Sequence, residues 1–186
     1  MEIEHCQFPD HLRYDPENNT WLATQGDGIV TVGITSLLSA IAGKLTSARI
    51  KSVGTGVERG NSLGTLEGVK FVGPVPSPVS GTIIAMNKDI VARPKLLNDA
   101  PYDGGWIVKL KPTSFLVEKI LLSNAFEVAE SFKRKIVETH ARCFKVFPDH
   151  EMFEIGIECS AVLVHLNELL ATVPIGETVH LVTDDP

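Results

Sequence analysis

Short apolar runs separated by Gly, Pro and Asp make up the first two thirds of the chain, a pattern typical of short β-strands joined by turns. Apolar residues 21–24 and 29–33 flank Gly26-Asp27-Gly28, and an Asp-Gly pair in that position supplies the positive φ angles of a tight hairpin. The segment 75–79 contains two prolines, and because proline cannot donate to a β-ladder we expect an edge strand or a connector there. Further strands are predicted over residues 45–53, 61–66, 81–87 and 106–111.

Helical periodicity is confined to a few segments. Three apolar residues at helical spacing follow Thr35, a suitable N-cap, so a short helix is predicted over 36–42 and ends at Gly43. Further helices are predicted over 92–97, 123–144 and 160–171, the last between strands over 152–157 and 178–183. The sequence therefore predicts a β-rich sandwich or flattened barrel, followed by a βαβ-like unit.

With 186 residues, the chain has room for one medium-sized domain or for a small domain with an appendage. Its formal net charge is −6, and the 17 Lys and Arg residues are scattered, so the basic stripe typical of nucleic-acid binding is missing. The apolar runs are much shorter than the roughly 20 residues needed to cross a bilayer, and the first five residues lack the features of a signal peptide. We therefore expect a cytoplasmic protein with neither a nucleic-acid partner nor a membrane partner.

The three cysteines, Cys6, Cys143 and Cys159, are too few and too far apart for a disulfide framework or for a zinc site built on paired cysteines. If one of them matters chemically, we expect it to act as a single thiol, and we expect no chemical role for Cys6 or Cys143. The six histidines show no metal-ligand spacing, so no metal site is predicted. The glycine-rich segment 54–60 misses the dinucleotide fingerprint and precedes a strand.

Four short motifs occur in order along the β-rich region. They are Gly-Ile-Val-Thr-Val-Gly-Ile-Thr at 28–35, Leu-Glu-Gly-Val-Lys at 66–70, Ser-Pro-Val-Ser-Gly at 77–81 and Asn-Asp-Ala-Pro-Tyr-Asp-Gly-Gly-Trp at 98–106. In order and spacing they resemble the H protein of the glycine cleavage system, over roughly residues 12–130. One such motif alone is weak evidence, whereas four in register make the resemblance specific.

In that family a lysine after a Glu-Ser-Val type segment carries lipoate through an amide bond, so the resemblance implies lipoylation of Lys70. The neighbouring residues Glu67, Gly68, Val69 and Phe71 form the attachment segment. A turn between two strands presents the lysine to solvent and fixes its direction, which suits a swinging arm. The implied partners are a lipoate ligase or lipoyl transferase, the glycine cleavage enzymes and dihydrolipoamide dehydrogenase. The implied role is that of a carrier, not of an enzyme.

Other interpretations of Lys70 stay open. Surface turns often carry an ordinary lysine, and biotinyl domains modify a lysine at a similar turn, although the flanking methionines of that family are Val69 and Phe71 here. Gly68 replaces the usual Ser of glycine cleavage H proteins, and residues 71–76 read Phe-Val-Gly-Pro-Val-Pro in place of small polar residues. These departures resemble the lipoate-binding proteins of sulfur oxidation and imply a sulfur-oxidising heterodisulfide-reductase-like complex as partner.

The segment from about residue 153 onward resembles the first half of a TusA-type sulfur carrier, in which a cysteine opens the first helix and carries a persulfide. Cys159 occupies that position here, and a helix N-terminus favours a thiolate. Ser160 and Val162 replace the two prolines of that family's motif. The resemblance implies a persulfide-carrying Cys159, and a sulfurtransferase is therefore a further alternative.

These patterns and resemblances predict a mainly β fold, a barrel-sandwich hybrid of the lipoyl and H-protein type with short helices and a small C-terminal α/β extension. The expected domains are a lipoyl-carrier domain over 1–122, a helical connector over 123–147 and a partial TusA-like βαβ segment over 148–186. The proline-rich segment and the C-terminal segment both resemble sulfur-handling proteins. The favoured function is therefore a lipoyl carrier in sulfur oxidation, with aminomethyl transfer in glycine cleavage as the alternative.

Overall fold

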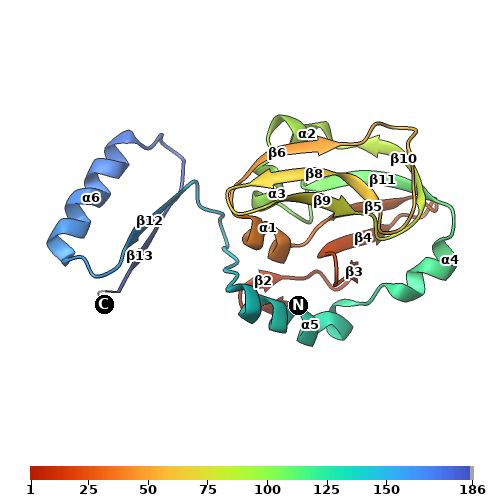
Figure 1. The fold of residues 1–186 in the computed structure, drawn as a ribbon, viewed down its shortest axis with the longest axis horizontal. Helices are drawn as coiled ribbons and strands as arrows, with labels where there is room; N and C mark the ends of the chain where they lie inside the picture. Colours follow the sequence, from red (N-terminus) through yellow and green to blue (C-terminus); the bar gives the residue numbers. More distant parts are fainter. Residues whose placement is uncertain (185–186) are drawn as a thin grey trace. The chain divides into compact units, whose positions relative to one another are not determined.

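The computed structural model describes residues 1–184, and the chain divides into two compact units, Met1–Lys145 and Val146–Pro186 (Figure 1). Residues 185 and 186, at the end of the predicted segment 148–186, lie outside the described residues. Among the described helices, none combines the length and the apolar character that a bilayer crossing needs.

Six short antiparallel strands form the larger sheet of the first unit (Figure 1). At its centre β5 (Val30–Ile34), which is buried along its whole length, pairs with β11 (Trp106–Pro112). The predicted hairpin is confirmed, because β4 (Thr20–Thr24) pairs with β5 across the Asp-Gly turn, where Gly28 has a φ of 78°. The remaining strands are β3 (Arg13–Asp15) beside β4, β10 (Gly81–Met86) beside β11, and β7 (Gly56–Val57) at the edge.

A smaller antiparallel sheet packs on the larger one and completes a sandwich (Figure 1). Its strands, in order, are β6 (Leu45–Ile50), β8 (Ser62–Gly68) and β9 (Val72–Pro76). Pro74 and Pro76 lie in β9, an edge strand, as expected for residues that cannot donate to a ladder. Side chains from both sheets form one buried cluster, which includes Ile34, Leu63, Leu66, Ile83 and Leu110. The predicted mainly β sandwich is confirmed.

Helix α1 (Ser36–Ala42) leads from the larger sheet to the smaller one and has the bounds predicted for it. The Oγ1 atom of Thr35 accepts a hydrogen bond from the amide of Leu38 at 3.2 Å, which caps the first turn. Gly43 then takes a φ of 69°, a conformation that favours glycine, and ends the helix.

The single helical turn predicted over 92–97 is wrong. The structure has two short helices instead, α2 (Lys88–Ala92) and α3 (Leu96–Asp99). Arg93 lies between them with non-helical backbone angles, because the following Pro94 disfavours helical angles in the residue before it. A short helix α4 (Phe115–Glu118) and a 3-10 turn η1 (Lys119–Leu121) follow β11 and were not indicated by the apolar pattern.

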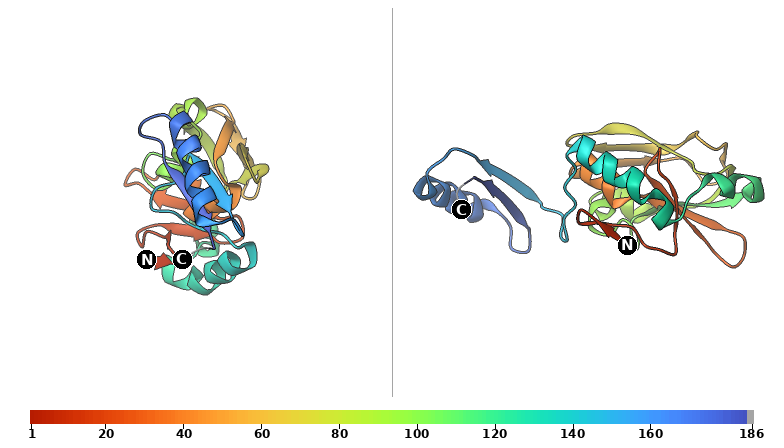
Figure 2. Two further views of the ribbon diagram at one scale, coloured as in Figure 1. Left: turned by 90° about the vertical axis from the view of Figure 1, so that its left-hand side faces the viewer. Right: turned by 90° about the horizontal axis from the view of Figure 1, so that it is seen from below.

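An N-terminal hairpin and a long helix form a second apolar cluster in the first unit. The hairpin consists of β1 (Glu2–Ile3) and β2 (Cys6–Gln7), and the helix is α5 (Ala125–Thr139) (Figure 2). The rings of Phe8 and Phe132 stack at 4.4 Å between centroids. Helix α5 lies in the segment predicted as a connector, and this packing makes it part of the first unit. The helix ends earlier than predicted because His140 adopts left-handed angles, with a φ of 50°.

Cys6 and Cys143 form a disulfide bond, with 5.0 Å between their Cα atoms. The expectation that the cysteines act only as single thiols is therefore wrong for these two residues. They are 137 positions apart in the sequence, and the fold brings them together because α5 returns the chain to the N-terminal hairpin. Spacing along the chain gives no sign of such a pair.

The second unit is a βαβ element, as predicted. Strands β12 (His150–Glu154) and β13 (Val179–Thr183) pair in parallel, and helix α6 (Cys159–Thr172) connects them (Figure 2). A parallel pair requires such a crossover connection. In the described part of this unit, Pro148 and Val162 are the only residues classed as fully buried.

Candidate functional site

Lys70 lies in the middle of the short loop that joins β8 to β9, with an exposed side chain. The loop consists of residues 69–71, and the amide of Gly68 donates to the carbonyl of Phe71 at 2.7 Å, which closes the turn. The turn predicted around this lysine is therefore present. The lysine therefore lies at the end of a hairpin whose two strands are paired.

The backbone of this loop is docked on the turn that follows helix α1. The amide of Lys70 donates to the carbonyl of Ala42 at 3.0 Å, and the amide of Val69 donates to the carbonyl of Lys44 at 3.1 Å. Carbonyls in the last turn of a helix lack partners within the helix, and Ala42 gains one from the loop. The backbone at Lys70 is therefore fixed by neighbouring backbone, whereas its side chain lies at the surface.

The glycine at position 68 allows this close approach. A Cβ atom on Gly68 would lie 2.6 Å from the carbonyl oxygen of Ala42, which is too close without a shift of the backbone. A Cβ atom on Gly43 would meet Cγ of Lys70 at 3.6 Å, so the stem of the lysine begins over Gly43. The Gly at position 68, where Ser is usual in the family that the sequence resembles, thus matches a tightly docked hairpin.

The apolar residues around Lys70 do not act as one surface. Val69 and Val72 are 71% and 73% exposed, whereas Phe71 is partly buried against the sandwich core. Its ring lies over Gly73, where an added Cβ atom would meet the ring at 2.5 Å. The exposed apolar surface beside the lysine therefore consists of the two valines, and Phe71 anchors the loop.

Glu67, another residue of the predicted segment, is directed across the sheet. Its carboxylate lies 3.7 Å from the guanidinium of Arg49 on β6, and its carbonyl accepts a hydrogen bond from the hydroxyl of Thr46 at 3.2 Å. Both partners belong to the neighbouring strand, so Glu67 ties β6 to β8 just before the loop.

Asn98 supports the docked loop from inside the protein and was not singled out by the sequence. Its Oδ1 atom accepts from the amide of Leu45 at 2.9 Å, and its Nδ2 atom donates to the hydroxyl of Ser39 at 2.8 Å and to the carbonyl of Gly43 at 2.9 Å. The side chain therefore fixes the turn on which Val69 and Lys70 dock. Asn98 opens the fourth of the sequence motifs, and that motif is the signal by which it could have been found.

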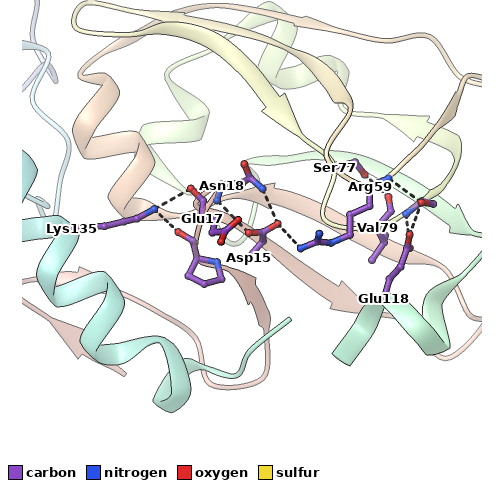
Figure 3. Close-up of polar contacts among 10 residues, drawn as sticks. Asp15, Glu17, Asn18, Arg59, Ser77, Val79, Glu118 and Lys135 are labelled. Atoms are coloured by element: carbon purple, nitrogen blue, oxygen red, sulfur yellow. Dashed lines mark hydrogen bonds and ion pairs between the residues drawn. The ribbon is translucent and has the colours of Figure 1, made fainter. Parts of the chain in front are cut away.

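A separate polar network connects β3, the loop before β8, and helices α4 and α5 (Figure 3). Arg59 lies 3.6 Å from the buried carboxylate of Asp15, and Ser80 donates through its amide to Glu118 at 2.7 Å. Lys135 donates to the carbonyl of Glu17 at 3.0 Å, and burial lowers the pKa of this lysine. All of these groups are engaged with one another across secondary-structure elements, so the network serves to fasten the fold.

Cys159, the predicted persulfide carrier, is the first residue of α6 and is exposed. The preceding residue, Glu158, is the N-cap but makes no side-chain hydrogen bond to the helix. Among residues 1–184 no group of three or more His, Cys, Asp or Glu side chains could hold a metal ion.

Comparison with known proteins connects the first unit with one family. The family model of the glycine cleavage H-protein matches residues 12–135. Glycine cleavage system H protein 5 of Aquifex aeolicus is 39% identical over 145 residues, which are 76% of this chain and 98% of that protein. Probable glycine cleavage system H protein 2 of Sulfolobus acidocaldarius is 38% identical over 77% of this chain and 97% of its own length.

A solved structure shows the same arrangement. The crystal structure of a glycine cleavage system H protein from Mycobacterium marinum superposes with a TM-score of 0.58 at 30% sequence identity. The match covers 66% of this chain and 97% of that chain. Both the sequence and the fold of the first unit are thus similar to those of H proteins.

Proposed function

The chain belongs to the glycine cleavage H-protein family, a family of lipoyl carriers, and we propose on this premise that Lys70 is its lipoyl attachment residue. The observation that supports this most directly is the docked hairpin. The backbone amides of Val69 and Lys70 are held by the turn after α1, while the lysine side chain is exposed. A ligase or transferase thus meets an accessible amine on a rigid loop, as a modification site requires.

The residues around Lys70 suit an acylated arm. Amide formation removes the ammonium charge, so the modified side chain is compatible with the exposed Val69 and Val72. When bound, the lipoyl group supplies disulfide and dithiol chemistry, and the protein supplies a fixed point of attachment. In this proposal the chain acts as a carrier, and the reactions of the carried group belong to partner enzymes.

Incubation with a lipoate ligase and lipoate tests the proposal. We expect one lipoyl increment in the intact mass, mapped to Lys70 by peptide mass spectrometry, and no increment in Lys70→Arg. Lys51→Arg, which changes an exposed lysine beyond the end of β6, is the matched control and should load like the parent chain. Absence of the increment, or its appearance on another lysine, would overturn the assignment.

For the carried group, aminomethyl transfer in glycine cleavage is the first candidate, because the relatives in question are named as glycine cleavage system H proteins. The partners on this reading are the glycine cleavage enzymes, a lipoate ligase or lipoyl transferase, and dihydrolipoamide dehydrogenase. The lipoylated chain, offered to a glycine decarboxylase with glycine, should gain an aminomethyl group. A loaded chain that accepts none would argue against this pathway.

Sulfur trafficking is the second candidate, and the second unit is the reason for it. Its helix α6 begins at the exposed Cys159, as a persulfide carrier would require. The partner on this reading is a sulfur-oxidising heterodisulfide-reductase-like complex. Alkylation of Cys159 should then abolish sulfur transfer, while Lys70→Arg separates a lipoyl-dependent role from a plain sulfurtransferase. If transfer survives alkylation, Cys159 has no such role.

A further inference from the structure

The Cys6–Cys143 disulfide lies beside a pocket at the surface of the first unit. Cys6 is fully buried, whereas Cys143 is partly exposed and lines a pocket of about 360 Å³. The pocket has apolar walls from Ile136, Ala141 and Phe144, and Arg142 adds a cationic group. Cys143 thus borders a pocket whose walls suit a molecule with an apolar body.

The hairpin that carries Cys6 has a tight two-residue turn. Glu4 and His5, which join β1 to β2, both have positive φ angles, of 46° and 65°, and neither is glycine. A two-residue hairpin loop favours positive φ at both of its positions, so these angles follow from the tight connection between β1 and β2. Both residues also line the pocket beside Cys143.

Helix α1 connects this pocket to the lysine hairpin. At its first residue the carbonyl of Ser36 lies 3.6 Å from Sγ of Cys143, and at its last residue the carbonyl of Ala42 accepts from the amide of Lys70 at 3.0 Å. Figure 1 shows α1 between the β8–β9 loop and β2. A seven-residue helix is roughly 10 Å long, so the disulfide and the backbone of Lys70 are about that far apart along it.

A lipoyl-lysine side chain is long enough for this span. About a dozen bonds separate its Cα atom from the nearest ring sulfur, which gives a reach of about 14 Å when extended. The stem of Lys70 begins over Gly43, at the same end of α1. Ala40, about one turn back toward Ser36, is small and partly exposed.

We propose that the Cys6–Cys143 disulfide is an internal exchange partner of a dithiol carried on Lys70. This inference rests on the proposed lipoylation. A thiolate of the reduced arm attacks Sγ of Cys143, the partly exposed member of the pair, and the Cys6–Cys143 bond breaks with Cys6 as the leaving group. The second thiolate of the arm then displaces Cys143 and closes the ring disulfide. The two protons and two electrons lost by the dithiol end on Cys6 and Cys143, which become thiols.

The surroundings of Cys143 suit both oxidation states. In the thiol form its sulfur can donate to the carbonyl of Ser36, which already lies within 3.6 Å. In the disulfide form the bond ties the N-terminal hairpin to the chain after α5. Oxidation of the lipoyl arm would therefore be coupled to reduction of this disulfide. The N-terminal hairpin and the chain after α5 would then no longer be covalently joined.

The test uses the complete, lipoylated chain. Its lipoylation is first verified by intact mass, and Cys159, the exposed cysteine outside the disulfide, is blocked with iodoacetamide. NADH and catalytic dihydrolipoamide dehydrogenase then reduce the arm. Samples are quenched with N-ethylmaleimide at intervals, and labelled cysteines are mapped by mass spectrometry. The control is Lys70→Arg, treated in the same way with an equal concentration of free lipoamide.

A tethered group has an effective concentration in the millimolar range, so at about 10 µM protein we expect Cys6 and Cys143 to become labelled about 100-fold faster in the lipoylated chain than in the control. Equal rates in the two samples, or an intact disulfide beside a fully reduced arm, would overturn the inference. Either result leaves the proposed lipoylation standing. If the first mass measurement shows no lipoyl group, the proposed function fails, and free dihydrolipoamide still shows whether the pocket disulfide exchanges.

Discussion

At the scale of single residues, several positions of this protein are fixed by one close neighbour. Gly33 in β5 lies directly opposite Trp21 in β4, and the indole ring covers its α-carbon. The ring cannot easily move, because its Nε1 atom donates to the carbonyl of Pro101 at 3.0 Å. Glycine is therefore required at position 33 by packing and not by backbone angles.

Gly33→Ala places a methyl group 2.5 Å from the Trp21 ring and should lower the free energy of unfolding by about 1–3 kcal/mol, the usual cost of overpacking. Urea unfolding followed by tryptophan fluorescence measures the change. Gly26→Ala is the matched control, because nothing lies within 4 Å of its added methyl group. Equal losses in both variants would contradict the packing argument.

We expect Tyr102 to make the free energy of unfolding of the first unit depend on pH. Its hydroxyl accepts from the amide of Ser36 at 3.0 Å and contacts the carbonyl of Gln7, and burial raises the pKa of Tyr102 to about 12. Because the folded state favours the neutral phenol, the stabilisation is complete below the ordinary pKa of 10.0 and is lost as the pH rises toward 12. The stability advantage of the parent chain over Tyr102→Phe, measured by urea unfolding between about pH 8 and pH 12, should therefore shrink above pH 10. A constant difference would refute the assignment.

At the scale of elements, the position of Lys70 depends on contacts among three short segments. The turn after α1 accepts the amides of Val69 and Lys70, and Asn98 of α3 holds that turn through Leu45 and Gly43. The hairpin alone would be free to bend at its base. The docked turn is therefore what gives a defined direction to the lysine.

Asn98→Ala should lower the free energy of unfolding by about 2 kcal/mol, because it leaves buried backbone groups without partners. Lipoylation of Lys70 by a ligase should also become slower, because the loop loses its support. Urea unfolding and the time course of the lipoyl mass increment measure the two effects. Asn61→Ala, at an exposed asparagine, should change neither. A stable variant with unchanged loading would show that Asn98 does not position the loop.

At the scale of the whole molecule, the two units differ in how they are built. Both apolar clusters of the structure draw their residues from Met1–Lys145. The described part of the second unit has two fully buried residues, Pro148 and Val162, and a two-stranded sheet. The first unit therefore contains what an independently folding domain needs.

A chain ending at Lys145 should unfold with a free energy within about 1 kcal/mol of that of the first unit in the full chain, since it keeps both clusters. It should also accept a lipoyl group at the same rate. Thermal and urea unfolding measure the stability of the fragment, and the intact-mass assay measures its rate of lipoylation. An aggregated fragment, or one that unfolds far earlier, would show that the second unit supports the first.

The sequence by itself determined the features that depend on neighbours along the chain. Alternation of apolar residues predicts the strands, the Asp-Gly turn predicts the β4–β5 hairpin, and Thr35 and Gly43 bound α1 as expected. The loop around Lys70 was equally visible, because turn residues and strand periodicity are local signals. One exception, over 92–97, arose where Pro94 divides one apparent helix into two, and the pattern also missed α4 and η1 and placed the end of α5 too late.

Only the tertiary structure decided which distant residues meet. The pairing of Cys6 with Cys143, the docking of the Lys70 loop on Ala42 and Lys44, and the support from Asn98 join segments far apart in the sequence. Such contacts depend on how two sheets and a helix pack around a shared core, and no local periodicity records that packing. The sequence thus indicated, through a family resemblance, the lysine that we propose as the attachment residue, whereas only the fold shows its docked backbone and the disulfide near the other end of α1.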